Sequence, residues 1–297
     1  MNLMENCRIC PRNCGIDRTS GKLGFCKSDS NIKRARADLH FWEEPCISGE
    51  SGSGTVFFSH CNMKCVFCQN YKISTENQGK KITTDELCDI FFMLQDKGAN
   101  NINLVTPTHY VPQIINAITI AKTKGLKLPF VYNTSGYETV DNIKMLEGYI
   151  DVYLPDFKYF DNKYAKKYSS CPDYLERASS ALHEMVSQVG ECKFDENGMI
   201  KKGVIVRHLM LPGLLFDSKK VIDYLYKTYG DKIFISIMSQ YTPLDTIPDG
   251  FDELKRQLPK GHYDALCDYA VELGITNAYV QDGESAKESF IPEFYTE

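Results

Sequence analysis

The stretch TVFFSHCNMKCVFCQN, residues 55–70, joins a short apolar run to three closely spaced cysteines. Residues 55–58 are β-branched or aromatic, which is typical of a buried strand. Cys61, Cys65 and Cys68 follow it directly with C-x3-C-x2-C spacing. Three thiolates on one short loop can point inward at a single inorganic centre. The stretch therefore predicts a metal-binding or cluster-binding loop at the end of a buried strand.

The number of thiols favours one kind of centre over another. Structural zinc sites use four ligands, usually as two separated pairs. Three thiolates suit a 4Fe–4S cluster that leaves one iron free for a substrate. Two alternatives stay open: a zinc site completed by Cys46 or Cys88, and plain buried cysteines.

Outward from this loop, short apolar runs alternate with helix-period segments. The other predicted strands are residues 102–105, 128–132, 150–154, 204–206 and 233–238, with a seventh at 278–281. Between them, sets such as Leu87, Ile90, Phe91 and Leu94 repeat at i, i+3, i+4, i+7, typical of amphipathic helices. This alternation predicts an α/β fold built of parallel βα units, a partial (β/α)6 TIM-like barrel or a doubly wound sheet.

The chain divides into two parts by pattern. Residues 51–297 carry the βα repeats, including a helix over 175–189 and a small hairpin that turns at Asn197-Gly198. Residues 1–50 form a short cysteine-rich N-terminal segment, and residues 1–45 show neither strand nor helix periodicity. We expect that segment to fold around its cysteines.

Polar side chains follow the predicted strands at the same end. They are Thr106, Thr108, His109, Asn133, Thr134, Ser135, Asp156, Lys158, Arg207, His208, Ser239 and Gln240. The carboxyl ends of parallel strands meet at one rim, where ligands bind. The sequence therefore predicts a polar ligand site at this rim, although any one of these residues could be a turn residue. His60 and His109 are the histidines best placed to take part.

Four more cysteines lie near the start of the chain, in CRICPRNCGIDRTSGKLGFC. Cys7, Cys10, Cys14 and Cys26 are enough to close one metal site. The spacing leaves zinc, a second iron–sulfur cluster and no metal all open. The basic run Lys33, Arg34 and Arg36 fits either a solvated face or a docking patch for an acidic reductant.

Composition excludes several classes of protein. The net charge of −5 leaves no face basic enough to predict nucleic-acid binding. No apolar run approaches the ~18 residues of a membrane span, and the first residues lack a signal-peptide core. Twelve cysteines among 297 residues are too few for a disulfide scaffold. We expect a cytoplasmic protein whose cysteines bind metal or do redox chemistry.

The cysteine loop resembles that of the radical S-adenosylmethionine (SAM) superfamily, with Phe67 before the last cysteine and a strand before the first. The stretch FFSHCNMKCVFCQNYKIS is similar to the pyruvate formate-lyase activating-enzyme-like proteins, in the branch with a cysteine-rich N-terminus. The resemblance implies a 4Fe–4S cluster on Cys61, Cys65 and Cys68 that reductively cleaves SAM to a 5′-deoxyadenosyl radical. It also implies an electron donor such as flavodoxin or ferredoxin.

The substrate that the resemblance implies is a glycine of a partner glycyl radical enzyme. Hydrogen abstraction from another peptide or from a small molecule is the alternative, and a non-catalytic zinc-binding module is a remote one. By the same resemblance, Phe67 packs beside the SAM adenine, Asp156 and Lys158 match a D-x-K motif near SAM, and Arg207 is a partner for the SAM carboxylate or ribose.

Two departures from the family pattern affect the expected SAM site. The family's Gly-Gly-Glu after the second strand is replaced by Thr106-Pro107-Thr108, so backbone carbonyls and the hydroxyls of Thr106 and Thr108 must hold the SAM amino group. The family's Asp-Thr-Asn-Gly after the third strand is replaced by Asn133-Thr134-Ser135-Gly136. The loss of the aspartate puts a monovalent cation site in doubt. Gln240 matches the family only by position.

Overall fold

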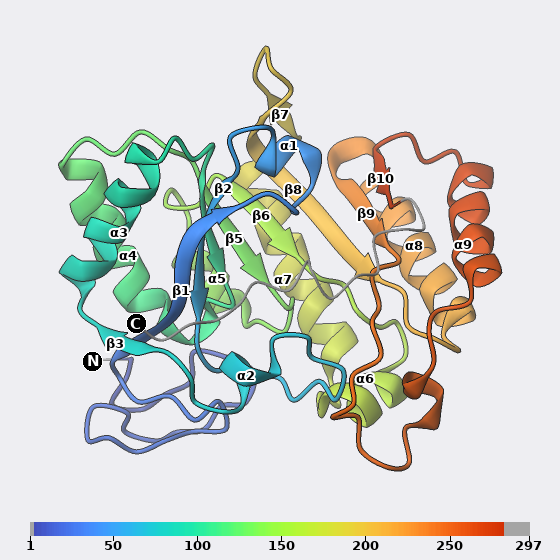
Figure 1. Ribbon diagram of the computed structural model, residues 1–297, viewed down its shortest axis with the longest axis horizontal. Coiled ribbons are helices and arrows are strands. Elements are labelled where there is room, and N and C mark those ends of the chain that lie inside the picture. Colours follow the sequence, from blue (N-terminus) through green and yellow to red (C-terminus); the bar gives the residue numbers. More distant parts are fainter. Residues whose placement is uncertain (1–2, 282–297) are drawn as a thin grey trace.

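One long, open sheet organises the chain in the computed structural model, which describes residues 3–281 (Figure 1). Its strand order is β10-β9-β8-β6-β5-β4-β2-β1-β3, with β7 paired to β8. The strands are β1 (Ile32–His40), β2 (Ser53–Phe58), β3 (Lys80–Ile82), β4 (Ile102–Val105), β5 (Phe130–Thr134), β6 (Val152–Pro155), β7 (Lys193–Phe194), β8 (Ile200–Leu209), β9 (Phe234–Met238) and β10 (Ala278–Val280). Neighbours from β2 through β10 along this order are parallel. The fold is therefore the predicted partial barrel, with the sheet left unclosed.

The helices are α1 (Pro45–Ser48), α2 (Tyr71–Ser74), α3 (Thr84–Asp96), α4 (Val111–Thr123), α5 (Val140–Lys144), α6 (Asn162–Ser169), α7 (Tyr174–Val189), α8 (Leu215–Tyr229) and α9 (Lys260–Glu272). The long helices α3, α4, α7, α8 and α9 cover the outer face of the sheet, whereas α1 and α2 lie at its two ends (Figure 1). The helix α3 begins with a capping box, in which Thr83 and Glu86 each bond the other's backbone N–H. In its predicted apolar stripe, Leu87, Phe91 and Leu94 are buried in the main core, and Ile90 is half-buried against it.

The predicted strands are all present, and the predicted helix and hairpin are confirmed as α7 and the β7–β8 turn. The prediction that residues 1–45 contain no strand is wrong. The strand β1 has nine residues and pairs antiparallel with both β2 and β3. Only Ile32 and Ala35 of β1 are buried, and its other residues are half-buried. Backbone pairing with β2, which side-chain periodicity cannot show, forms this strand.

Residues 3–31 contain no helix or strand and lie at the end of the sheet where α2 lies (Figure 1). Arg12 ties the segment to the cysteine loop and to the end of α6: its Nε donates to the carbonyl of Asn62 at 2.8 Å and its Nη1 to that of Ser170 at 2.7 Å. No helix within residues 3–281 is long and apolar enough to cross a membrane.

Candidate radical and cofactor site

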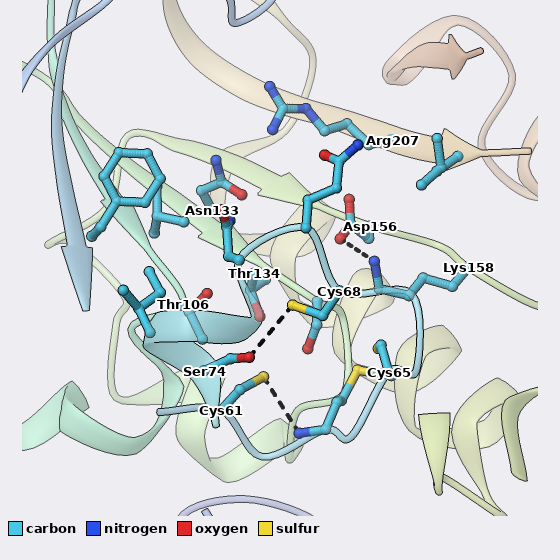
Figure 2. Close-up of a pocket in the computed structure, with 18 of the residues that line it drawn as sticks. Cys61, Cys65, Cys68, Ser74, Thr106, Asn133, Thr134, Asp156, Lys158 and Arg207 are labelled. Carbon is cyan, nitrogen blue, oxygen red and sulfur yellow. Dashed lines mark hydrogen bonds and ion pairs between the residues drawn. The ribbon is translucent and has the colours of Figure 1, made fainter. Parts of the chain in front are cut away.

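The three cysteines of the central loop line one cavity of about 260 Å³ (Figure 2). The fully buried strand β2 delivers the chain to this point, and His60 turns it with a positive φ of 75°. Figure 2 shows the sulfur atoms of Cys61, Cys65 and Cys68 around one space. Short loop connections and a rigid strand therefore hold three sulfur ligands on one wall of a cavity.

Each sulfur has a nearby polar group. The backbone N–H of Met63 donates to Cys61 Sγ at 3.4 Å, and the hydroxyl of Ser169 donates to Cys65 Sγ at 3.0 Å. Cys68 Sγ lies 3.5 Å from Ser74 Oγ. Such hydrogen bonds orient ligands and tune an iron–sulfur centre.

Burial disfavours the thiolate form of Cys61 and Cys65. It raises the pKa of Cys61 to about 12 and that of Cys65 to about 11, and the neighbouring cysteines add to the effect. Lys158 acts in the opposite direction on the pKa of Cys65. The thiols of Cys61 and Cys65 are therefore protonated at neutral pH until a metal displaces the protons.

Lys158 and Asp156 form an ion pair beside the loop, with Nζ and Oδ2 2.6 Å apart (Figure 2). Burial opposes the charge of Lys158, but Asp156 and Cys65 outweigh burial and raise its pKa above the ordinary value. The cavity therefore has a fixed cation next to its sulfur ligands.

The sulfur set fits a cluster better than a single ion. Within residues 3–281, no three Cys, His, Asp or Glu side chains converge on the position of one metal ion. A cubane places each thiolate on a different iron, so its ligands stand farther apart than those of one zinc. Three sulfurs around one cavity with a cation beside them are therefore suited to a 4Fe–4S cluster.

Eight of the twelve predicted rim residues come together at the same cavity, whereas Thr108, His109, His208 and Ser239 do not line it. His208 is buried, with its Nδ1 2.7 Å from the carbonyl oxygen of Phe157. Besides the cysteines, the cavity is lined by Phe67, Thr106, Asn133, Thr134, Ser135, Asp156, Lys158, Arg207 and Gln240. They come from the loop after β2 and from the carboxyl ends of β4, β5, β6, β8 and β9. One cavity thus offers hydroxyl, amide, carboxylate and ammonium groups within reach of the sulfur ligands.

Two of the predicted rim residues donate their hydroxyl hydrogen bonds to a buried carboxylate, Glu138, which the sequence analysis did not predict. Thr108 does not line the cavity: its hydroxyl donates to Glu138 at 2.6 Å, as does that of Thr134. Tyr132 and Asn142 also donate to Glu138, whose pKa burial raises. A Glu next to a tyrosine after a strand carries no sequence signal for this role.

The two histidines differ in position. His60 lines the cavity, while the Nε2 of the buried His109 lies 2.8 Å from the carbonyl of Ser59. Burial lowers the pKa of His60 to about 4 and that of His109 to about 3. Both side chains are therefore neutral at physiological pH.

Arg207 is paired within the protein. Its guanidinium contacts the carboxylates of Glu43 and Glu44, with Nε 2.8 Å from Glu44 Oε1. All three side chains are nearly buried, and Arg207 and Glu43 line the cavity. Sequence reasoning assigned Arg207 to the SAM carboxylate or ribose and missed the two glutamates. An ion pair between residues more than 160 positions apart has no local pattern that could reveal it.

Gly136 brings the end of β5 against the loop that carries Asp156. It has a φ of 77°, and a Cβ built on it would lie 2.3 Å from the carbonyl oxygen of Asp156. We predict that Gly136→Ala destabilises the fold clearly more than Gly148→Ala, measured by denaturant unfolding. Gly148 has nearly the same φ, 79°, but nothing within 4 Å, so it reports the backbone strain alone, about 1–2 kcal/mol. Equal losses of stability in the two variants would mean that the loop carrying Asp156 moves away from the added methyl group at little cost.

Comparison with known proteins agrees with this site. The pattern of the Radical SAM superfamily matches residues 55–225, more than half of the chain. The protein therefore belongs to the radical SAM superfamily, whose enzymes use a 4Fe–4S cluster and SAM.

Two proteins of Methanocaldococcus jannaschii are similar in sequence. The uncharacterized protein MJ0674 is 30% identical over 252 residues, 82% of this chain and 68% of that protein. The putative glycyl-radical enzyme activating enzyme MJ1227 is 26% identical over 208 residues, 69% of this chain and 79% of that protein.

The fold is similar to that of Streptococcus suis SuiB, solved with its precursor peptide SuiA and with S-adenosylmethionine. Each comparison gives a TM-score of 0.51 at 14% identity and covers 75% of this chain. This chain spans about half the length of SuiB, 47% and 48% in the two structures. At this identity the likeness shows the fold alone.

Proposed function

We propose that this radical SAM enzyme is an activating enzyme, which removes a hydrogen atom from a glycine of a partner glycyl radical enzyme. The observation that carries the proposed chemistry is the cavity where three thiols of one loop face the polar ends of the parallel strands. The choice of substrate is supported by the similarity to MJ1227.

The residues of the cavity divide into two sets. Cys61, Cys65 and Cys68 would hold the 4Fe–4S cluster, and the polar rim would hold SAM. When bound, the cluster and SAM supply a carbon-centred radical for hydrogen abstraction. The work left to this chain is to bind, to orient and to exclude water.

Polar groups on different walls of the cavity would orient SAM. Lys158 presents a positive charge to an incoming carboxylate, while Thr106, Asn133 and Ser135 offer oxygen atoms to an ammonium group. These oxygens replace the carboxylate that related sequences have after the second strand. Phe67, Leu209 and Met238 line the cavity with apolar surface, which limits the access of water to the radical.

The entrance has exposed aromatic side chains suited to a protein partner. Trp42, which lines the cavity, is 60% exposed, and Phe41 beside it is 49% exposed. Exposed aromatic residues are enriched at protein interfaces. We propose that a loop bearing the substrate glycine enters on this side. An electron donor such as flavodoxin or ferredoxin would supply the reducing electron.

Replacing Lys158 should lower the affinity for SAM, with a smaller effect on the rate at which bound SAM is cleaved. We expect Lys158→Met to raise the SAM dissociation constant by about 10- to 100-fold, since a lost charge-assisted hydrogen bond costs about 1.5–3 kcal/mol. Equilibrium binding to the reconstituted protein measures it. Lys166→Met on the exposed face of α6 is the matched control. Equal SAM affinities in the Lys158→Met and Lys166→Met variants would show that Lys158 does not bind SAM.

The substrate assignment is tested by electron paramagnetic resonance. Reduced protein, SAM and each glycyl radical enzyme of the same organism are mixed without oxygen. We expect a glycyl radical on one of these partners, and none with the Cys65→Ala variant. If SAM is cleaved but no partner acquires a radical, the substrate is another peptide or a small molecule.

A further inference from the structure

The N-terminal segment is held in place with very little apolar burial. Within residues 3–31, the hydrophobic cluster consists of only Met4, Cys7 and Ile9, with Ile16 at its margin; Cys10 and Cys26 are buried outside it. The cysteines of the described chain are all free thiols, so no disulfide stabilises the segment. A segment with so small a core needs another source of stability, and metal binding is the usual one.

A buried guanidinium lies next to these cysteines without a carboxylate. Arg18 is 1% exposed. It donates to the carbonyl oxygen of Asp29 at 2.6 and 3.1 Å and to that of His109 at 2.8 Å. The Asp29 carboxylate pairs with Lys81 instead. Among the described residues, no Asp or Glu forms an ion pair with Arg18, whose Nη1 lies 3.8 Å from Cys7 Sγ. A buried charge without a counter-charge is costly, and the sulfur of Cys7 is close enough to supply one.

A second cation lies between the two cysteine groups. Lys64 Nζ is buried and has no hydrogen-bond partner. It lies 5.5 Å from the centre of the Phe25 ring. Burial lowers the pKa of this ammonium group, as do two neighbouring cations, while Cys61 on the central loop and Cys26 in the N-terminal segment act in the opposite direction. The ammonium group of Lys64 is therefore close to thiols of both cysteine groups and can balance negative charge on either.

The N-terminal thiols are arranged like ligands. Cys7, Cys10 and Cys26 are all buried, and Cys10 lies near enough to the other two for them to raise its pKa in addition to the larger effect of burial. The backbone N–H of Phe25 donates to Cys14 Sγ at 3.4 Å. Gly24 allows this approach, because a Cβ there would lie 3.1 Å from the same sulfur.

The central loop shows the same contact at a residue of the radical SAM motif. In the central loop, the N–H of Met63 donates to Cys61 Sγ, also at 3.4 Å. In the N-terminal segment, the backbone N–H of Arg12 likewise donates to the thiol of Cys10, two residues earlier in the chain. Backbone N–H groups directed at sulfur stabilise thiolates and tune iron–sulfur clusters.

We propose that Cys7, Cys10, Cys14 and Cys26 bind a second 4Fe–4S cluster, whose negative charge Arg18 and Lys64 balance. Four thiolates carry more negative charge than the iron–sulfur core neutralises, which supplies the counter-charge that both cations lack. A single zinc would need the four sulfurs to converge on one point. Among the described residues, no three Cys, His, Asp or Glu side chains are placed to hold one metal ion, which is as true of these four cysteines as of Cys61, Cys65 and Cys68. The inference does not depend on the identity of the substrate.

The composition of the metal centres tests the proposal directly. Full-length protein is reconstituted without oxygen, and iron, acid-labile sulfide and zinc are measured. We expect about 8 iron and 8 sulfide per chain. About 4 of each should remain when Cys61, Cys65 and Cys68 are all changed to serine, and Cys88→Ser should change nothing. About 4 iron in the wild type, or none in the triple variant, would overturn the proposal, as would one zinc held by the N-terminal segment.

The counter-charge is tested on the triple variant, in which only the N-terminal centre remains. We expect Arg18→Met to make its midpoint potential more negative, because the reduced cluster loses a stabilising cation. Lys27→Met, at an exposed position of the same segment, should shift the potential less, and Arg18→Lys should restore it in part. An unchanged potential in Arg18→Met would show that Arg18 does not balance this centre.

Discussion

Arg207→Met is expected to destabilise the fold by about 3–5 kcal/mol, although Arg207 lies at the cavity wall and not in the main core. Removing the guanidinium leaves Glu43 and Glu44 as two nearly buried carboxylates without a cation. Denaturant unfolding at neutral pH measures the loss. Arg177→Met, which breaks an exposed pair with Asp173, should cost about 0–1 kcal/mol.

The pH dependence of this loss has a definite sign. Burial raises the pKa of Glu44, but Arg207 outweighs burial and holds it below its ordinary value of 4.5. A carboxyl with a lowered pKa stabilises the fold above its ordinary pKa, and that stabilisation is lost as the pH falls through the folded-state value. The difference between wild type and Arg207→Met should therefore shrink below about pH 4.5. A difference that stays constant with pH, or equals that of Arg177→Met, would contradict the buried network.

Cys65→Ala is expected to remove nearly all the iron of the central cluster, with little effect on folding. Cys65 lines the cavity and accepts a hydrogen bond from Ser169, and two remaining thiolates cannot hold a cubane that needs three protein ligands. Iron analysis and visible absorbance of reconstituted protein measure the loss. Cys88→Ala, a buried cysteine of α3 outside the cavity, should keep the wild-type iron content. Full iron at the central loop of Cys65→Ala would mean that other residues ligate the cluster.

Much of this fold could be predicted because its signals are local. The parallel strands are short apolar runs between amphipathic segments, and the C-x3-C-x2-C loop directly follows one of them. The strand β1 could not be predicted, since Ile32 and Ala35 are its only buried side chains and pairing with β2 stabilises it.

The parts of the site that escaped prediction depend on contacts between distant residues. The pairing of Arg207 with Glu43 and Glu44 joins β8 to the turn before α1. Thr108 follows a strand, as the rim residues do, yet its hydroxyl points to the buried Glu138. Position after a strand thus predicted eight residues that line the cavity, but it could not show that Thr108, His109, His208 and Ser239 lie outside it.

The measurement that tests the central claim most directly is 5′-deoxyadenosine formation from SAM by reduced, anaerobically reconstituted protein. The account predicts product from the wild type and from Cys88→Ala, and none from Cys65→Ala. No product from a wild-type sample that holds a reduced cluster, with and without its candidate partners, would contradict SAM cleavage at the Cys61–Cys65–Cys68 site.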